Sequence, residues 1–316
     1  MTPDLLDADL RAALGTLSTE EVGGEFAGLD ALGTLDAARL MNAADATVPA
    51  AVEAVLPALA AAVDRIADGM RRGGRLLYVG AGTAGRLGVL DASECPPTFD
   101  TDPGRVVGLI AGGPVALTTA VEGAEDDGDQ GGHDVLAQGV GPLDTVVGIS
   151  ASGRTPYAIG AVRAARTAGA FTVGLSCNAG SALGGAADVA LEVVVGPEVV
   201  AGSTRLKSGT AQKLVLNMLS TLTMVRLGKT YGNLMVDLRA TNDKLRARSW
   251  RIVREATGAA DPEVDAAMDA AHGEVKVAIA VLVAGVDAAT ARAALEHHDG
   301  VLRAALDSLT TPTTKD

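Results

Sequence analysis

Residues 80–98, GAGTAGRLGVLDASECPPT, bring together a glycine-rich loop and an acid, Glu94. Three glycines at this spacing permit a tight turn whose backbone N–H groups can approach an anion closely. A helix after the loop would point its N-terminus at the same anion. The two prolines after Cys95 are expected to stop that helix and to fix the backbone beside Glu94. The stretch therefore predicts a phosphate cradle next to an acid. The glycines are Gly80, Gly82 and Gly85.

The pattern Gly-x-Gly-x-x-Gly also fits a dinucleotide fingerprint, but that match is weak by itself. A dinucleotide site needs an acid at the end of the next strand, about 20 residues on. Here that strand, 106–112, ends in two glycines and a proline. The P-loop pattern fails as well, because no Gly-Lys-Ser/Thr follows. A purely structural glycine turn remains the alternative.

A second cluster of polar residues follows the predicted strand 145–150. Ser150, Ser152 and Thr155 place three hydroxyls around Gly153 and the start of a helix. Hydroxyls and N–H groups in this arrangement can replace the water around a phosphate. The alternative is an ordinary helix N-cap by Ser152 or Thr155. One cap needs one hydroxyl rather than three, so we interpret the cluster as phosphate-binding.

A third polar stretch, residues 196–210, precedes a long predicted helix at 210–227. It contains one acid, several hydroxyls and two bases. Alternatively, Ser208 or Thr210 only caps the helix.

Short, nearly continuous apolar runs alternate with helical stretches over the middle of the chain. This pattern predicts a parallel sheet with helices on both faces, and ligands then bind at the carboxyl ends of the strands. The predicted strands are 75–80, 106–112, 145–150, 171–177 and 189–195, and the predicted helices are 48–72, 85–92, 114–123, 155–168, 181–186 and 210–227. We expect an N-terminal helical arm at 1–46, a domain at 47–258 that contains this sheet and the polar loops, and an Ala-rich helical domain at 259–316.

Composition limits the class of protein. The chain has 26 Lys plus Arg against 39 Asp plus Glu, a net charge of −13, which argues against nucleic-acid or membrane-surface binding. Cys95 and Cys177 make no disulfide framework, so a cytoplasmic location is expected. The four His and two Cys have no metal-ligand spacing, and we expect neither metal nor organic cofactor.

The motifs together resemble one family, the N-acetylmuramic acid 6-phosphate etherases, within the sugar isomerase (SIS) domain superfamily. The residues that carry the resemblance are 80–98, 121–127, 150–157, 196–213 and 228–244. The resemblance implies a three-layer α/β/α sandwich with a five-stranded parallel sheet, a small C-terminal helical (UBA-like) domain and a homodimer. It also implies a lyase that cleaves the D-lactyl ether of N-acetylmuramate 6-phosphate, in cell-wall amino sugar recycling or catabolism.

The resemblance assigns functions to individual residues. Glu94 and Glu125 match the catalytic acids of the family, and Thr83, Ser150, Ser152 and Thr155 match its phosphate contacts. The full set that we expect to bind substrate or phosphate is Gly82, Thr83, Arg86, Ser150, Ser152, Gly153, Thr155, Glu198, Ser203 and Lys207. The chain departs from the family at Ala84, where a serine is usual, so one hydroxyl is missing.

Two other functions stay open on the same fold. One is a phosphosugar-binding regulatory protein similar to the glucokinase regulatory protein, and the other is an aldose–ketose isomerase. Glu94 favours the etherase, because elimination of a poor leaving group needs two carboxyl groups, one of them protonated near neutral pH. We expect burial or a like-charged neighbour to keep that carboxyl protonated.

Overall fold

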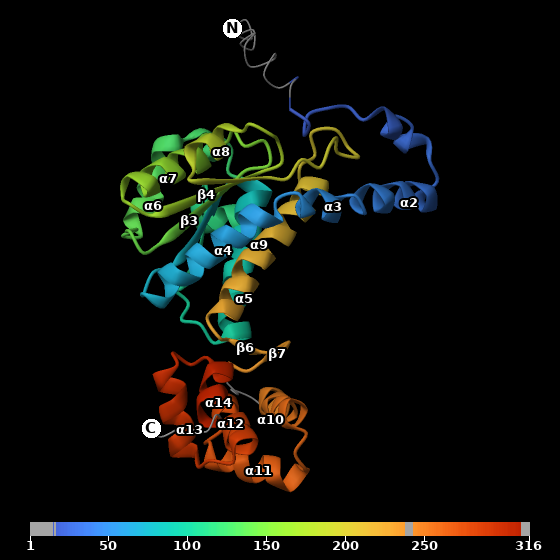
Figure 1. The fold of residues 1–316 in the computed structure, drawn as a ribbon. Coiled ribbons are helices and arrows are strands. Elements are labelled where there is room, and N and C mark those ends of the chain that lie inside the picture. The colour runs from blue at the N-terminus through green and yellow to red at the C-terminus, as the bar shows by residue number, and fades with distance from the viewer. Residues whose placement is uncertain (1–14, 16, 238–242, 311–316) are drawn as a thin grey trace, which may run out of the picture. The chain divides into compact units, whose positions relative to one another are not determined.

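A computed structural model of the protein describes residues 15, 17–237 and 243–310 (Figure 1). By contacts between Cα atoms, the chain forms two compact units. The first comprises Met1–Ser93 and Gly104–Ser220, and the second comprises Glu94–Pro103 and Thr221–Asp316.

The first unit is built on a five-stranded parallel sheet, as the sequence predicts. The strand order is β2-β1-β3-β4-β5. The strands are β1 (Leu76–Gly80), β2 (Val106–Ile110), β3 (Thr145–Ile149), β4 (Phe171–Ser176) and β5 (Val189–Glu192). Gly80 at the end of β1 is in register with Ile110 and Ile149, so the carboxyl ends of three neighbouring strands are level. The loops expected to bind phosphate follow two of these ends.

Helices cover both faces of the sheet. On one face, Leu77 and Val79 of β1 pack with apolar residues of α6 (Gly128–Ala137) and α7 (Pro156–Thr167). On the other, Tyr78 contacts α5 (Gly82–Phe99), since its hydroxyl donates to Asp91 at 2.9 Å. This alternation follows from the strand period of two. The remaining elements are η1 (Gly24–Phe26), η2 (Leu29–Ala31), α2 (Thr34–Asp45), α3 (Val48–Glu53), α4 (Leu56–Arg71), η3 (Gly113–Leu117), η4 (Ala124–Asp126), α8 (Ala182–Ala186) and α9 (Lys207–Arg226).

The expectation that Pro96 and Pro97 stop the helix after the glycine loop is wrong. Helix α5 continues through both prolines to Phe99, and the carbonyl of Pro96 accepts from the N–H of Asp100 at 3.0 Å. Proline has a φ suited to a helix, and what it lacks is the N–H. Both prolines lie in the last turn, where they remove two donors without preventing their own carbonyls from accepting.

Two further helix predictions are wrong, and one helix was not predicted. The single helix expected at 48–72 is broken into α3 and α4, because Pro57 cannot donate back to the preceding turn and instead starts a new helix. Where a helix was expected at 114–123, the structure has only the 3₁₀ turn η3. The glycines at its start, Gly112 and Gly113, have φ of 83° and 68°. Helix α6 was not predicted, because its glycine-rich sequence disfavours a helix. Those glycines allow it to pack closely on α7, since a Cβ at Gly131 would collide with the carbonyl oxygen of Tyr157.

The second unit is mainly helical. Its helices are α10 (Asp243–Thr257), α11 (Asp261–Ala270), α12 (Val275–Ala284), α13 (Ala288–His297) and α14 (Leu302–Thr310), and a small hairpin pairs β6 (Thr230–Tyr231) with β7 (Leu234–Met235). Val253 of α10 shares one apolar core with Ile279 and Leu302. Helix α10 therefore packs with the helices that follow it, and a separate domain starting at residue 259 stays a prediction.

No single helix in the described part of the chain is long and apolar enough to cross a membrane. Two bent helix pairs reach the required length and composition only when their members are joined.

Candidate active site

The loop between β1 and α5 is the tight turn that the three glycines predict. A Cβ at Gly80 would lie 2.9 Å from the nitrogen of Gly85 and from the carbonyl oxygen of Ile149. A Cβ at Gly85 would lie 2.6 Å from the carbonyl oxygen of Gly80. Gly82 has a φ of +53° and open space around its Cα. Side chains at Gly80 and Gly85 would displace backbone, so these two glycines allow strand and helix to approach this closely, whereas Gly82 is favoured by its positive φ.

The hydroxyls of the loop after β3 converge around Ser150. Its Oγ lies 2.8 Å from Thr155 Oγ1 and 3.3 Å from Ser152 Oγ, and it accepts from the N–H of Gly153 at 3.0 Å. Thr155 occupies the N-cap position of α7, yet its side chain makes no capping hydrogen bond. The simple N-cap alternative therefore fails for Thr155. We call the group of Ser150, Ser152, Gly153 and Thr155 the hydroxyl loop.

The segment before α9 is organised by Glu198, which is only 1% exposed. Its two carboxylate oxygens accept from the N–H groups of Lys207 at 2.8 Å and Ser208 at 2.9 Å. The alternative that Ser208 or Thr210 caps the helix therefore fails, because the cap is supplied by an acid nine residues before the first residue of the helix. The buried Lys207 ammonium donates to the carbonyl of Pro197 at 3.2 Å.

Two predicted residues of the glycine loop have different surroundings. A Cβ placed on Gly209 in α9 would lie 3.7 Å from Thr83 Cγ2, so Thr83 lies beside the start of α9. Arg86 Nε instead donates to the carbonyl of Leu117 at 3.0 Å. Thr83 therefore lies next to the start of α9, which Glu198 caps. The Arg86 guanidinium is instead hydrogen-bonded to η3 through Nε. Ser203 lies half-buried in the turn before α9.

The two predicted catalytic acids lie in different units. Glu94 is in the second unit, on the part of α5 that precedes the prolines, and Glu125 is in η4 of the first unit. Both carboxylates are exposed. The burial that we expected to keep one acid protonated is therefore absent at both positions.

Sequence comparisons place these features in a family. Family models described as "Glucokinase regulatory protein N-terminal SIS domain" and "SIS domain" match residues 58–166 and 125–222. An N-acetylmuramic acid 6-phosphate etherase of Streptomyces avermitilis is 67% identical over 94% of this chain and 96% of its own length. The etherases of Streptomyces coelicolor (65% identical, 94% and 96% covered) and Serratia proteamaculans (57%, 93% and 99%) are similar over the same extent.

The chain belongs to the N-acetylmuramic acid 6-phosphate etherase family. The resemblance that the motifs carried is thereby confirmed. So is the SIS fold class, with its five-stranded parallel sheet and additional C-terminal helices.

Sequence reasoning missed one polar contact of this family member. The side chain of Asn178, just after β4, donates to Thr19 Oγ1 at 3.0 Å and to the carbonyl of Ala151 at 3.1 Å, and it accepts from Ser18 Oγ at 2.9 Å. The N-terminal segment is thereby fixed against the hydroxyl loop. A cavity of about 620 Å³ opens there, lined by Leu17, Ser18, Ser152, Arg154, Asn178, Ala179, Gly180, Ser181, Ala182 and Val194. The available signal was the position of Asn178 at the carboxyl end of a parallel strand.

A buried acid on α5 was also missed. Asp91 accepts from Tyr78 at 2.9 Å, from Asn217 at 2.6 Å and from Ser220 at 3.2 Å. Burial raises the pKa of Asp91, although these hydrogen bonds and the nearby Lys213 oppose the shift. Asp91 therefore joins β1, α5 and α9 through one carboxyl group.

The thiol of Cys177 lies close to the Glu198 segment but is unreactive. Burial raises its pKa to about 12, with a hydrogen bond to Ser208 opposing the shift and the charge of Glu198 adding to it. The thiolate is the nucleophilic form, so this cysteine is not a candidate nucleophile.

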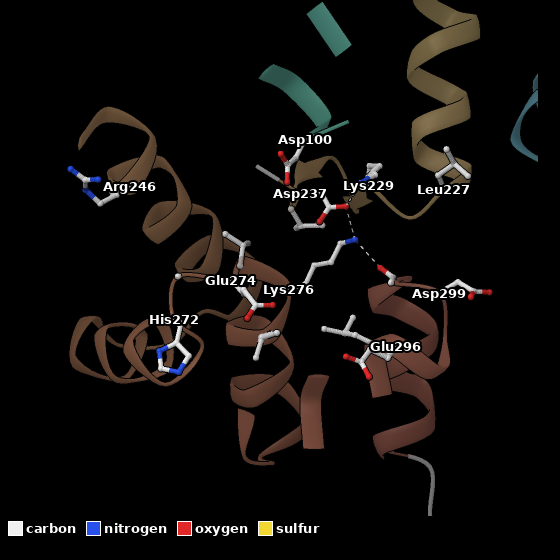
Figure 2. A pocket seen from close by; sticks show the side chains of 16 residues that line it. Asp100, Leu227, Lys229, Asp237, Arg246, His272, Glu274, Lys276, Glu296 and Asp299 are labelled. Carbon is white, nitrogen blue, oxygen red and sulfur yellow. Dashed lines mark hydrogen bonds and ion pairs between the residues drawn. The ribbon is translucent and has the colours of Figure 1, made fainter. Parts of the chain in front are cut away.

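A cavity of about 1010 Å³ in the second unit is lined by none of the predicted site residues (Figure 2). Its central group is Lys276, which donates to Asp237 at 2.9 Å and to the carbonyl of Gly300 at 2.8 Å. Burial lowers the pKa of Lys276, and Asp237 partly restores it. Lys229 also pairs with Asp237, at 2.8 Å. Both ammonium groups are thus paired with Asp237, and four further acids line the cavity, Asp100, Glu274, Glu296 and Asp299, so it offers no clear complement to a phosphosugar.

Among the side chains that the structure describes, no group of three or more His, Cys, Asp or Glu could hold a metal ion.

Proposed function

We propose that this protein cleaves the D-lactyl ether of N-acetylmuramate 6-phosphate, giving N-acetylglucosamine 6-phosphate and D-lactate. The observation that carries this proposal is the 67% identity, over nearly the full chain, to a protein named N-acetylmuramic acid 6-phosphate etherase. The hydroxyl loop supports it independently, because it offers several hydroxyls that are not needed for capping.

The phosphate is proposed to bind in the hydroxyl loop. Ser150, Ser152 and Thr155 would exchange their mutual hydrogen bonds for bonds to phosphate oxygens, and charge-assisted bonds of this kind are the stronger ones. The proposed contacts from neighbouring segments are Gly82, Thr83, Arg86, Ser203 and Lys207. We propose that Glu198 acts at the sugar site by holding the start of α9, since both of its oxygens already accept from backbone. Binding energy gained at the phosphate would position the reacting carbons, which lie several bonds away.

The reaction is proposed to be an elimination followed by addition of water. Opening of the sugar ring gives an aldehyde that acidifies the C2 proton, a base removes this proton, and the lactate oxygen leaves C3 as an acid protonates it. Water then adds to the unsaturated aldehyde. We assign Glu94 to the protonation of lactate and the activation of water, and Glu125 to ring opening or C2 proton transfer.

We propose that the working form is a homodimer in the cytoplasm. Glu94 is exposed in one chain, whereas a general acid active near neutral pH needs a raised pKa, which burial provides. Leu90 lies four residues before Glu94 on α5, hence on a similar face, and is 52% exposed. A second copy that covers Leu90 would also desolvate Glu94. Cys95 and Cys177 are buried and form no disulfide, which suits a reducing compartment.

The test is incubation with N-acetylmuramate 6-phosphate and an enzymatic assay for free D-lactate. A regulatory phosphosugar-binding protein would bind the sugar and release no lactate, and an aldose–ketose isomerase would convert the sugar without releasing lactate. Lactate release that depends on the 6-phosphate supports the proposed function and its place in cell-wall amino sugar recycling or catabolism.

A further inference from the structure

Among the described residues that line the cavity of about 620 Å³ beside the hydroxyl loop, Arg154 is the one with an ionisable side chain. The other lining residues are apolar, hydroxyl, amide or glycine residues. Glu192 accepts from the backbone N–H groups of two lining residues, Gly180 and Ser181, at 2.7 and 2.8 Å, and does not itself line the cavity. The described lining residues therefore offer one positive charge and no negative charge to a ligand.

Arg154 is well placed to use this charge on a ligand. Its backbone N–H donates to Ser152 Oγ at 3.2 Å, so the residue is part of the hydroxyl loop itself. The side chain is exposed, and no ion pair of its guanidinium is found among the described residues. A second cavity, of about 550 Å³, also borders Arg154 and contains Asp129. Arg154 and Asp129 form no ion pair there, and the guanidinium remains available.

We propose that Arg154 binds the carboxylate of the lactyl group and thereby distinguishes the ether substrate from phosphosugars without that group. This inference rests on the proposed function. The substrate carries two anionic groups, and the hydroxyl loop accounts for only one of them. A guanidinium can hold a carboxylate through two parallel N–H···O bonds, which gives geometric specificity as well as affinity. Because Ser152 and Arg154 line the same cavity, one ligand can reach both the hydroxyl loop and the guanidinium.

The experiment compares Arg154→Gln with Arg163→Gln, a matched control. Arg163 is an exposed arginine on α7, the helix that follows Arg154, and it lines the cavity of about 550 Å³ but not the one beside the hydroxyl loop. Both changes remove one positive charge. For each variant, the KM for N-acetylmuramate 6-phosphate is measured from D-lactate release. The dissociation constants of this sugar and of N-acetylglucosamine 6-phosphate, which lacks the carboxylate, are measured by calorimetry.

We expect Arg154→Gln to raise the KM of the ether substrate about 10- to 100-fold, as for a lost hydrogen bond to a charged group. Its affinity for N-acetylglucosamine 6-phosphate should stay that of the wild type, and Arg163→Gln should behave as the wild type with both sugars. Arg154→Lys should recover only part of the loss, because an ammonium cannot form the two parallel bonds.

Two results would overturn the proposal. An equal loss of affinity for both sugars would place Arg154 on the phosphate, and no loss for either would leave it without a role in binding. Failure of the wild-type protein to release lactate would refute the proposed function instead. The calorimetric comparison of the two sugars would still decide the role of Arg154.

Discussion

Replacing Thr155 by valine removes one hydroxyl from the hydroxyl loop and keeps the shape of the side chain. Among the described residues this hydroxyl bonds to Ser150 alone, at 2.8 Å, and it does not cap α7. Ser150 Oγ still accepts from the N–H of Gly153 in the variant. The cost to the free energy of unfolding should therefore be that of one neutral hydrogen bond, about 0.5–1.5 kcal/mol.

The effect on substrate binding should be larger. A hydrogen bond to a charged group contributes about 1.5–3 kcal/mol, so loss of the bond to phosphate should raise KM roughly 10- to 150-fold. The kcat should hardly change, because the lost bond is present in both the bound substrate and the transition state. Inhibition by inorganic phosphate should weaken in the same proportion as substrate binding.

Thr167→Val is the control, because Thr167 lies at the other end of α7 and donates to the carbonyl of Arg163 at 2.9 Å. It should leave KM unchanged. An unchanged KM in Thr155→Val, or a lower kcat at constant KM, would refute the assignment of this loop to the phosphate.

The remaining predictions concern three acids. Glu94→Gln keeps the shape of the side chain but cannot transfer a proton, so kcat for lactate release should fall about 10²–10⁴-fold with little change in KM; an undiminished kcat would remove Glu94 from the mechanism. For Asp144, burial raises the pKa, but hydrogen bonds from the side chain and backbone of Arg75 and from Gly141 outweigh burial and lower it below 3.8. Its contribution to stability is therefore present above about pH 4 and lost as the pH falls through the folded-state pKa, and Asp144→Asn should flatten this acid limb in urea titrations. The pKa of Asp91 is raised instead, so its contribution is lost as the pH rises through the folded-state value. Asp91→Asn should match the wild type in stability near pH 3 and exceed it at pH 7, and a loss of stability at pH 7 would contradict this account.

Sequence-based predictions of helices failed where the propensity of single residues was outweighed by their surroundings in the fold. The two prolines after Cys95 are strong helix breakers by themselves, yet α5 continues through them, because their φ suits a helix and their own carbonyls can still accept from the next turn. The glycines of α6 lower its helix propensity, but they are what allow its close contact with α7. In both cases, whether a helix formed depended on the adjoining turn or on a packed helix, and the residue types of the segment itself do not show either of these.

The sequence by itself determined the five strands and the two loops expected to bind phosphate. Apolar runs, glycines and hydroxyls are local signals, and a parallel sheet brings the carboxyl ends of its strands to one edge. Only the tertiary structure showed that Asn178 fixes Thr19, 159 residues away in the chain, beside the hydroxyl loop. It alone also showed that Glu198 caps α9, and that Arg154 is the one ionisable side chain among the described residues lining the cavity beside that loop. Such contacts join residues that are far apart in the sequence, and local residue types and spacings do not show which of these residues will lie together in the fold.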